Sequence, residues 1–515
     1  MPQKKQENKE KAAGTVGFIF ITLILVKILG QAREMAIAAF FGTSDAASAY
    51  VIASQLPVNF FDMILGTAVS SAFIPVFNKY LECDGLKRAN LFASRFLNII
   101  ILASSAICAI GMFFAPSLIN IFSPDMTSGA KEIAGTLLRI MFPIMIFTGM
   151  AFTLVGVLQS LGEFKIPAMM SLISNAICIL YLFTLNKYFG IYGLAAAFLI
   201  GWAMQFFVLI LPSKKNGFVY NSGKKLWDDG LKTVVTLALP VLLSSWVQPI
   251  NAMVNMALAS GKEGGIASLN YANRLYIIAA SVFAVSITNY IFPKLSQMNV
   301  RGENESWSKT VASGLRYVVM IVLPMALVFI FQGKEIIRIV YQRGAFTETD
   351  VAVTSSAILF YSLGMIFYSL QEICNKAFYS LESMKTPMFA AIGSIFTNVV
   401  LSYVLSSYMG ISGLALAASI AASIWSIFML IALSRKMTVK LFDKSIIKIL
   451  VMCTGFGCGV FFTRNFSIAF FGELGLLTSV INFVLPCAAG AVVYVLLGFI
   501  LKIDEIKYIK KFFKL

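Results

Sequence analysis

The chain is a succession of long apolar runs separated by short polar segments. Apolar runs of 18 or more residues are typical of membrane-spanning helices. Proline, glycine and polar breakers divide these runs into about fourteen predicted spans. They lie at roughly 13–41, 46–78, 88–120, 129–161, 166–187, 191–212, 230–260, 265–297, 307–331, 347–381, 386–408, 412–434, 444–464 and 474–502. The pattern therefore predicts an all-α polytopic membrane protein, with tilted or bent helices where a run exceeds the bilayer thickness.

The two halves of the chain resemble each other. Residues 160–197 and 380–417 align without a gap. The matching pairs are Ser160/Ser380, Leu161/Leu381, Lys165/Lys385, Pro167/Pro387, Gly190/Gly410, Gly193/Gly413 and Leu194/Leu414. We therefore expect two six-helix lobes, 13–212 and 230–434, related by a pseudo-twofold axis along the membrane normal, with two extra helices after them. Transporters place their substrate at the interface between such repeats.

Charge patterning orients the chain. Lysine and arginine number 41 against 24 acidic residues, a net charge of +17. With both termini in the cytoplasm, about 25 of the loop and tail cations fall inside and about 7 outside, as the positive-inside rule requires. The polar segments are then a cytoplasmic amino-terminal tail (1–12), an inter-lobe linker (213–229) and a basic carboxyl-terminal tail (503–515). Membrane topology thus explains the positive charge, and we expect membrane lipids as partners and no nucleic acid.

Several chemistries are excluded by composition. The chain contains no histidine, its seven cysteines are scattered singly, and it has no GxxxxGK[ST] motif. Histidine-based catalysis, the common zinc sites and nucleotide hydrolysis by a phosphate-binding loop are therefore not expected. An enzyme should place paired carboxylates, or a nucleophile with its base, in a sizeable loop, and the loops here are short. A scaffold would give no reason for cations inside the spans, so we expect a transporter. We expect no cofactor and no metal site.

Charges inside the spans are few. Lys27, Arg33 and Glu34 interrupt the first span, around Gly30, which permits a bend; Arg274 interrupts the eighth. A charge at the bilayer centre costs roughly 2.5–3.5 kcal/mol, so such residues usually face a bundle interior or a watery cavity. Forked arginine and lysine donors suit phosphate oxygens. We therefore expect a cationic cleft between the lobes that binds a phosphate-bearing substrate; Glu34 either holds Arg33 or couples to an ion.

A second group of residues is assigned to the cavity less specifically: Asp62, Ser48, Asn273 and Arg139. For Arg139 two interpretations stay open, cavity lining or snorkelling to the nearer interface. Outside the spans, Thr347 and Asp350 have the spacing of a capping box that begins the tenth helix. Arg343 and Gly344 just before it predict a turn.

Several motifs resemble one family. The stretches "ILGQARE", "YANRLY", "YQRGAFTETD" and "AFYSLESMKTP" are similar to those of the MurJ (MviN) lipid II flippases, within the multidrug, oligosaccharidyl-lipid and polysaccharide exporters. This resemblance implies alternating-access export of lipid II, the undecaprenyl-pyrophosphate-linked peptidoglycan precursor, across the bacterial inner membrane, by a protein we expect to be monomeric. It further implies that the last two helices hold the lipid tail. Lys27, Arg33, Glu34 and Arg274 match the family's cavity motif.

The chain departs from the family at three places. Asp62 stands where many relatives carry paired arginines, and Ser48 stands where an acidic residue is usual. The positions that bind sodium in some relatives are Asn255, Asn398 and Ser402 here. Without carboxylates we expect a monovalent cation to bind weakly at most, which leaves the membrane potential as a possible driving force.

Two alternative substrates stay open from the residues. The same fold exports other undecaprenyl-linked glycans for surface polysaccharides, and substrate does not follow from fold. A drug or cation antiporter is the third interpretation. It would need an excess of carboxylates in the cavity, whereas the best-placed charges here are positive.

Overall fold

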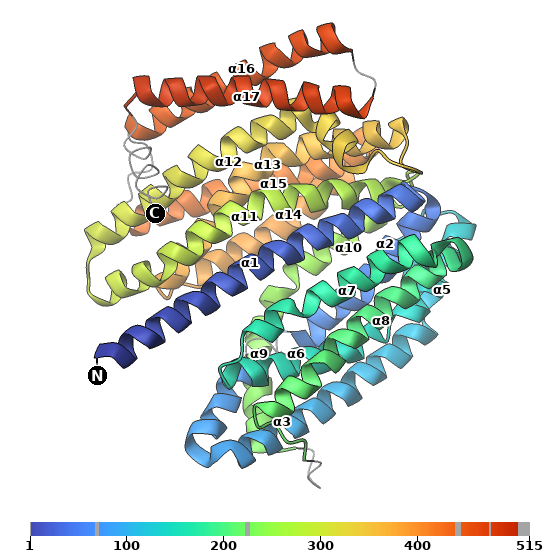
Figure 1. Ribbon diagram of the computed structural model, residues 1–515, viewed down its shortest axis with the longest axis vertical. Helices are drawn as coiled ribbons and strands as arrows, with labels where there is room; N and C mark the ends of the chain where they lie inside the picture. The colour runs from blue at the N-terminus through green and yellow to red at the C-terminus, as the bar shows by residue number, and fades with distance from the viewer. Residues whose placement is uncertain (1, 67–71, 222–226, 438–443, 473–474, 503–515) are drawn as a thin grey trace. The chain divides into compact units, whose positions relative to one another are not determined.

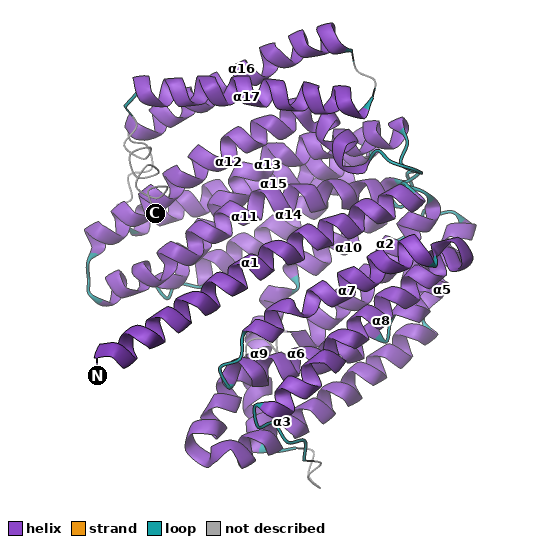
Figure 2. Cartoon of the chain, viewed as in Figure 1, coloured by secondary structure: helices purple, strands orange, loops and turns teal. Residues whose placement is uncertain are grey.

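A computed structural model describes residues 2–66, 72–221, 227–437, 444–472 and 475–502 (Figure 1). Every element in these ranges is a helix, and no strand occurs in them (Figure 2). The all-α prediction is confirmed. The basic carboxyl-terminal tail predicted at 503–515 lies outside the described residues.

By contacts the chain divides into two compact units, residues 1–266 and 267–515. The first unit contains α1 (Pro2–Phe41), α2 (Asp45–Phe61), the π-helical turn η1 (Asp62–Gly66), α3 (Ile74–Phe113), α4 (Ala115–Phe122), α5 (Ser128–Met141), α6 (Ile144–Ser160), α7 (Lys165–Thr184), α8 (Asn186–Lys215), α9 (Asp229–Ser245) and α10 (Val247–Ala259). The helix α11 (Gly265–Val300) starts at the end of this unit and runs into the second. There follow α12 (Asn304–Tyr341), α13 (Glu348–Ser380), α14 (Lys385–Met409), α15 (Ile411–Lys436), α16 (Lys444–Phe471) and α17 (Leu476–Ile500).

The predicted spans coincide with helices. Among the described residues, eleven helices are long and apolar enough to cross a membrane. The remaining three predicted spans correspond to α1, to α2 with η1, and to the pair α9–α10. The chain is therefore a multi-span membrane protein, while the count of fourteen stays a prediction, as do the lobe boundaries and the linker at 213–229.

The second and third predicted spans are divided differently in the structure. The second predicted span, 46–78, ends in the structure at Phe61, after which the chain forms η1. The helix α3 then begins at Ile74 and continues through a kink at Gly85, where φ is 80°. Only glycine adopts such a backbone conformation without strain, so the kink at Gly85 takes the place of the loop expected between the second and third spans.

In the first unit, helices pack as neighbouring pairs. The helix α7 packs against both α1 and α8, α2 packs against α5, and α6 packs against α3 and α8. Between α7 and α8 the approach is close, because a Cβ atom at Gly201 would lie only 2.9 Å from Cα of Ser174. This packing fixes the part of α1 that carries the predicted cavity charges.

In the second unit, α13 packs against α12 and α15, and α14 packs against α15. The last two helices, α16 and α17, form an antiparallel pair that lies against α12 (Figure 1). Within the pair, a Cβ at Gly459 would lie 3.1 Å from Cα of Gly490. The Tyr494 hydroxyl donates to the Met320 carbonyl over 2.5 Å and ties the pair to α12.

The internal repeat has a counterpart in backbone geometry. The matching residues Gly190 and Gly410 adopt φ/ψ of 51°/−141° and 58°/−131°. The turns after α6 and α13 also match: the backbone N–H of Glu163 donates to the Leu158 carbonyl over 2.9 Å, and that of Ser383 to Phe378 over 3.0 Å. The two copies therefore share local structure as well as sequence.

The helix start predicted at Thr347 is confirmed. The Thr347 hydroxyl accepts from the backbone N–H of Asp350, and the Asp350 carboxylate accepts from the N–H of Thr347, a complete capping box. The preceding turn contains Gly344 with φ of 59°, and the Arg343 guanidinium donates to carbonyl groups at the end of α12.

Candidate functional site

The helix α1 carries three of the four best-placed charges. It is helical without a break through Gly30, so the bend that this glycine permits does not interrupt the helix. Lys27 and Glu34 are seven residues apart and lie on nearly one face, about 10 Å along the axis. The Lys27 side chain is exposed, whereas Glu34 is buried.

Arg33 forms an ion pair with its neighbour. Its Nη2 donates to Oε1 of Glu34 over 2.7 Å, and the two side chains are 14% and 9% exposed. The guanidinium carbon lies 5.5 Å from the ring centroid of Phe198 on α8, a cation–π contact. Its Nε atom is buried and has no hydrogen-bond partner among the described residues. The guanidinium is thus held in place on two sides with donor capacity left over.

Aromatic rings from two other helices surround this pair. Phe198 packs edge-on against Tyr50 of α2, with centroids 6.1 Å apart, and against Trp202 at 6.2 Å. Burial among rings removes water from around the guanidinium and strengthens its attraction for an anion. The sequence did not single out Phe198 and Tyr50. The chain contains 45 phenylalanines, and an aromatic residue in an apolar helix is not distinguished from its neighbours by sequence alone.

Arg274 lies on α11 and is exposed. No acidic side chain lies within ion-pair distance of it in the part of the chain that the structure describes. Its neighbour Asn273 is half-buried and lies close to the Tyr361 side chain of α13. Tyr361 in turn stacks on Tyr276, with centroids 5.2 Å apart. Among the described residues the charge of Arg274 is therefore uncompensated, and a stacked pair of tyrosine rings lies next to it on α11 and α13.

The four predicted cavity residues divide between the two units. Lys27, Arg33 and Glu34 belong to residues 1–266, and Arg274 belongs to residues 267–515. Their meeting in one cleft therefore stays a prediction.

The less specific cavity residues differ in their surroundings. Ser48 on α2 is buried, and its hydroxyl has no partner among the described residues. Asp62 is exposed at the first position of η1. Arg139 is exposed on α5, and its Nε donates to the Met112 carbonyl near the end of α3 over 3.3 Å. This contact ties α5 to α3 and favours a structural role for Arg139.

The three positions considered for cation binding carry neutral side chains. Asn255 is half-buried on α10 in the first unit. Asn398 and Ser402 are buried one turn apart on α14 in the second unit, and Ser402 Oγ lies 3.4 Å from Asn398 Oδ1. No cluster of three or more histidine, cysteine or acidic side chains occurs among the described residues. These positions thus offer neutral oxygens, which attract a monovalent cation less than carboxylates do.

Sequence reasoning also missed an interhelical ion pair. Nη2 of Arg464 on α16 donates to Oε1 of Glu335 on α12 over 3.1 Å, with side chains 25% and 4% exposed. A charge within an apolar run marks each residue as unusual in the sequence. The pairing itself could not be predicted, because 129 positions separate the two residues. The pair fixes α16 to α12.

Known proteins match the chain over most of its length. The sequence model of the family described as lipid II flippase MurJ matches residues 37–497. The probable lipid II flippase MurJ of Treponema pallidum is 27% identical over 432 residues, covering 81% of each chain. The lipid II flippase MurJ of Burkholderia cenocepacia is 25% identical over 422 residues, covering 80% of this chain and 82% of its own.

Solved structures agree. The structure described as lipid II flippase MurJ in an inward closed conformation superposes with a TM-score of 0.81 at 26% identity, covering 95% of this chain and 99% of its own. An inward-facing multidrug resistance transporter of the MATE family, within the MOP superfamily, superposes with a TM-score of 0.68 at 13% identity. The match covers 81% of this chain and 98% of that transporter's chain. That second likeness shows a shared fold.

Proposed function

This chain belongs to the lipid II flippase MurJ family, and from that membership we propose that it moves lipid II from the inner to the outer leaflet of the bacterial cytoplasmic membrane. The observation that carries the proposal is the family match over residues 37–497. The superposition on a lipid II flippase over 95% of the chain supports it. The multi-span helical architecture suits a carrier that works by alternating access between two lobes.

The pyrophosphate of the substrate is the group that the cavity cations would bind. Arg33 supports this role because its guanidinium is fixed by Glu34 and Phe198 and still has a buried Nε without a partner. Arg274 adds a second guanidinium, and Lys27 adds an exposed point charge. Forked guanidinium donors match phosphate oxygens, and charge-assisted hydrogen bonds are about twice as strong as neutral ones. Glu34 acts in this proposal as the positioning group for Arg33.

The helix pair α16–α17 would hold the polyprenyl tail of the substrate. Its described surface exposes large apolar side chains, among them Phe462, Phe466, Phe470, Val484 and Val492. Attachment to α12 through Glu335–Arg464 and Tyr494 keeps this surface beside the second unit's helices.

Transport in this proposal needs no nucleotide hydrolysis by the chain itself. A charge that moves with the carrier gains about 2.3 kcal/mol per 100 mV of membrane potential. Coupling to sodium at Asn255, Asn398 and Ser402 would lack a carboxylate ligand. We place both termini in the cytoplasm, from the lysine and arginine distribution, and propose that one chain suffices.

Depletion of the protein in its own host cell tests the function. Lipid II should then accumulate on the cytoplasmic face, where an externally added lipid II-cleaving enzyme cannot reach it. Wild-type protein supplied in trans should restore cleavage. Unchanged export of lipid II, with loss of another surface glycan, would overturn the proposal.

A further inference from the structure

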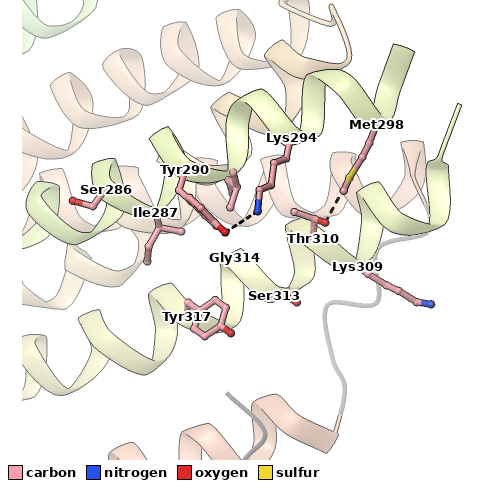
Figure 3. A pocket seen from close by; sticks show the side chains of 11 residues that line it. Ser286, Ile287, Tyr290, Lys294, Met298, Lys309, Thr310, Ser313, Gly314 and Tyr317 are labelled. Atoms are coloured by element: carbon pink, nitrogen blue, oxygen red, sulfur yellow. Dashed lines mark hydrogen bonds between the residues drawn. The ribbon is translucent and has the colours of Figure 1, made fainter. Parts of the chain in front are cut away.

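A groove separates the facing surfaces of α11 and α12 in the second unit (Figure 3). Its volume is about 510 Å³, within the roughly 300–1,000 Å³ of small-ligand sites. The lining residues are Ser286, Ile287, Tyr290, Ile291, Lys294, Met298, Lys309, Thr310, Ser313, Gly314 and Tyr317. None of them belongs to the predicted cavity set.

The two ends of the groove differ in polarity. The helices are antiparallel, because the Thr310 hydroxyl meets the Met298 sulfur at 3.7 Å near the turn that joins them. Lys294 and Lys309 lie toward this turn, which also carries Arg301. Farther from the turn the lining is largely apolar and aromatic, with Ile287, Ile291, Gly314 and Tyr317. The groove is thus amphipathic along its length, as a lipid molecule is.

Of the two lysines that line the groove, Lys294 has no acidic partner among the described residues. Its Nζ contacts the Tyr290 side chain, 2.7 Å from the hydroxyl and 4.0 Å from the ring centroid (Figure 3). No carboxylate lies within 4.0 Å of it among the described residues. Lys309, by contrast, is paired with Glu305 at 2.6 Å and is 75% exposed. A lysine ammonium has three donors, so Lys294 retains capacity for a ligand's oxygens.

Hydroxyl groups stand near this lysine. Ser313 lies on the α12 wall of the same groove, and its Oγ accepts from Nη2 of Arg316 over 3.2 Å. Thr310 also lines the groove, and its Oγ1, which donates to the Ser306 carbonyl over 2.8 Å, can still accept a hydrogen bond. A phosphate placed here would meet ammonium and hydroxyl groups together.

The groove is separate from Arg274, the predicted transport-site residue on the same helix. Lys294 follows Arg274 by twenty residues on α11, about 30 Å along the helix axis. A substrate pyrophosphate held by Arg274 therefore cannot reach Lys294.

We propose that this groove binds one anionic glycerophospholipid, with its phosphate on Lys294 and an acyl chain along Ile287, Ile291 and Tyr317. Both walls are membrane-spanning helices, so the surrounding medium supplies lipid. The expected orientation puts the α11–α12 turn in the cytoplasm, and basic pockets between helices on that side bind anionic headgroups. The bound lipid would brace the two helices, independently of which lipid-linked glycan the protein exports.

Native mass spectrometry of the purified full-length protein tests this site. The probes are dioleoyl phosphatidylglycerol and, as the neutral comparison, dioleoyl phosphatidylcholine. Wild-type protein should retain one phosphatidylglycerol in preference to phosphatidylcholine. Lys294→Gln should weaken phosphatidylglycerol retention about fivefold, the effect of one cation near the membrane surface. Lys214→Gln, an exposed lysine at the end of α8, is the matched control and should behave as wild type.

Three outcomes would overturn the proposal. Equal retention of the two lipids would remove the headgroup preference. Equal loss in Lys294→Gln and Lys214→Gln would make the effect one of net charge. Displacement of the lipid by millimolar inorganic phosphate would show that the acyl chain contributes nothing. Size-exclusion profiles of each variant establish that it is folded, and lipid II export is not part of the readout, so the two proposals can fail separately.

Discussion

Nη2 of Arg33 lies 2.7 Å from Oε1 of Glu34, its immediate neighbour on α1. Adjacent side chains on a helix point about 100° apart, so residues one position apart rarely pair. Here burial of both groups and the Phe198 ring beneath the guanidinium bring them together. Of the two roles open to Glu34, this geometry favours holding Arg33.

Arg33→Ala should reduce lipid II transport by at least about tenfold, because it removes charge-assisted hydrogen bonds to the substrate. Transport by Arg33→Lys should lie between that of Arg33→Ala and that of wild type, because lysine keeps the positive charge but cannot donate two parallel hydrogen bonds. The measurement is complementation of the depleted host at equal membrane protein level. Arg33→Ala also leaves the buried Glu34 carboxylate unpaired, so the double variant Arg33→Ala/Glu34→Ala is the control for stability. Normal transport by that double variant would exclude Arg33 from the transport site.

Glu34→Gln should retain more transport than Glu34→Ala, because the amide still offers an oxygen to the Arg33 guanidinium. The same complementation assay, read with thermal unfolding of each purified variant, separates anchoring from coupling. If Glu34→Gln is as inactive as Glu34→Ala while unfolding at the wild-type temperature, the carboxylate charge itself is required and Glu34 couples to an ion.

Arg274→Ala and Arg139→Ala should have different effects. Arg274 is exposed on α11 without an acidic partner in the described residues, so its loss should abolish transport and leave insertion intact. Arg139 donates to the Met112 carbonyl, so its loss should leave most transport. Equal activity of the two variants would contradict the assignment of Arg274 to the cavity.

Arg464→Ala should lower the free energy of unfolding by about 3 kcal/mol, because it leaves the buried Glu335 carboxylate without its partner. Thermal unfolding in detergent measures this. Lys309→Ala breaks the exposed pair with Glu305 and should leave the unfolding temperature unchanged. An equally small effect of Arg464→Ala would show that α16 is held by apolar packing alone.

The repeat itself makes a prediction. Glu382 adopts φ of 54° at the position matched by Gly162, which has φ of 85°. A side chain in this left-handed region costs roughly 1–2 kcal/mol. Glu382→Gly should therefore raise the free energy of unfolding by about 1 kcal/mol, and Gly162→Ala should lower it by a similar amount. A fall in unfolding temperature for Glu382→Gly would mean that its side chain makes contacts worth more than the strain.

The helices were predictable because an apolar segment that crosses a bilayer must hydrogen-bond its own backbone N–H and C=O groups, which an α-helix does. The repeat was readable because glycine at 190 and 410 serves one backbone conformation in both copies. The end of α2 at Phe61 could not be predicted from the sequence. The apolar run continues past Phe61, while the backbone changes from an α-helix to the π-helical turn η1. The charged site residues could be identified because they lie in otherwise apolar spans. Phe198, which contacts Arg33, could not, because it is one apolar residue among many.

Transport by the purified protein tests the central claim most directly. The protein is reconstituted into vesicles that carry fluorescent lipid II, and a membrane-impermeant quencher reports the fraction in the outer leaflet over time under an imposed membrane potential. We predict rapid equilibration between leaflets with wild-type protein, and rates close to those of protein-free vesicles with the Arg33→Ala/Glu34→Ala variant. Wild-type rates no faster than those of protein-free vesicles, or equal rates for wild type and the double variant, would contradict lipid II transport through this site.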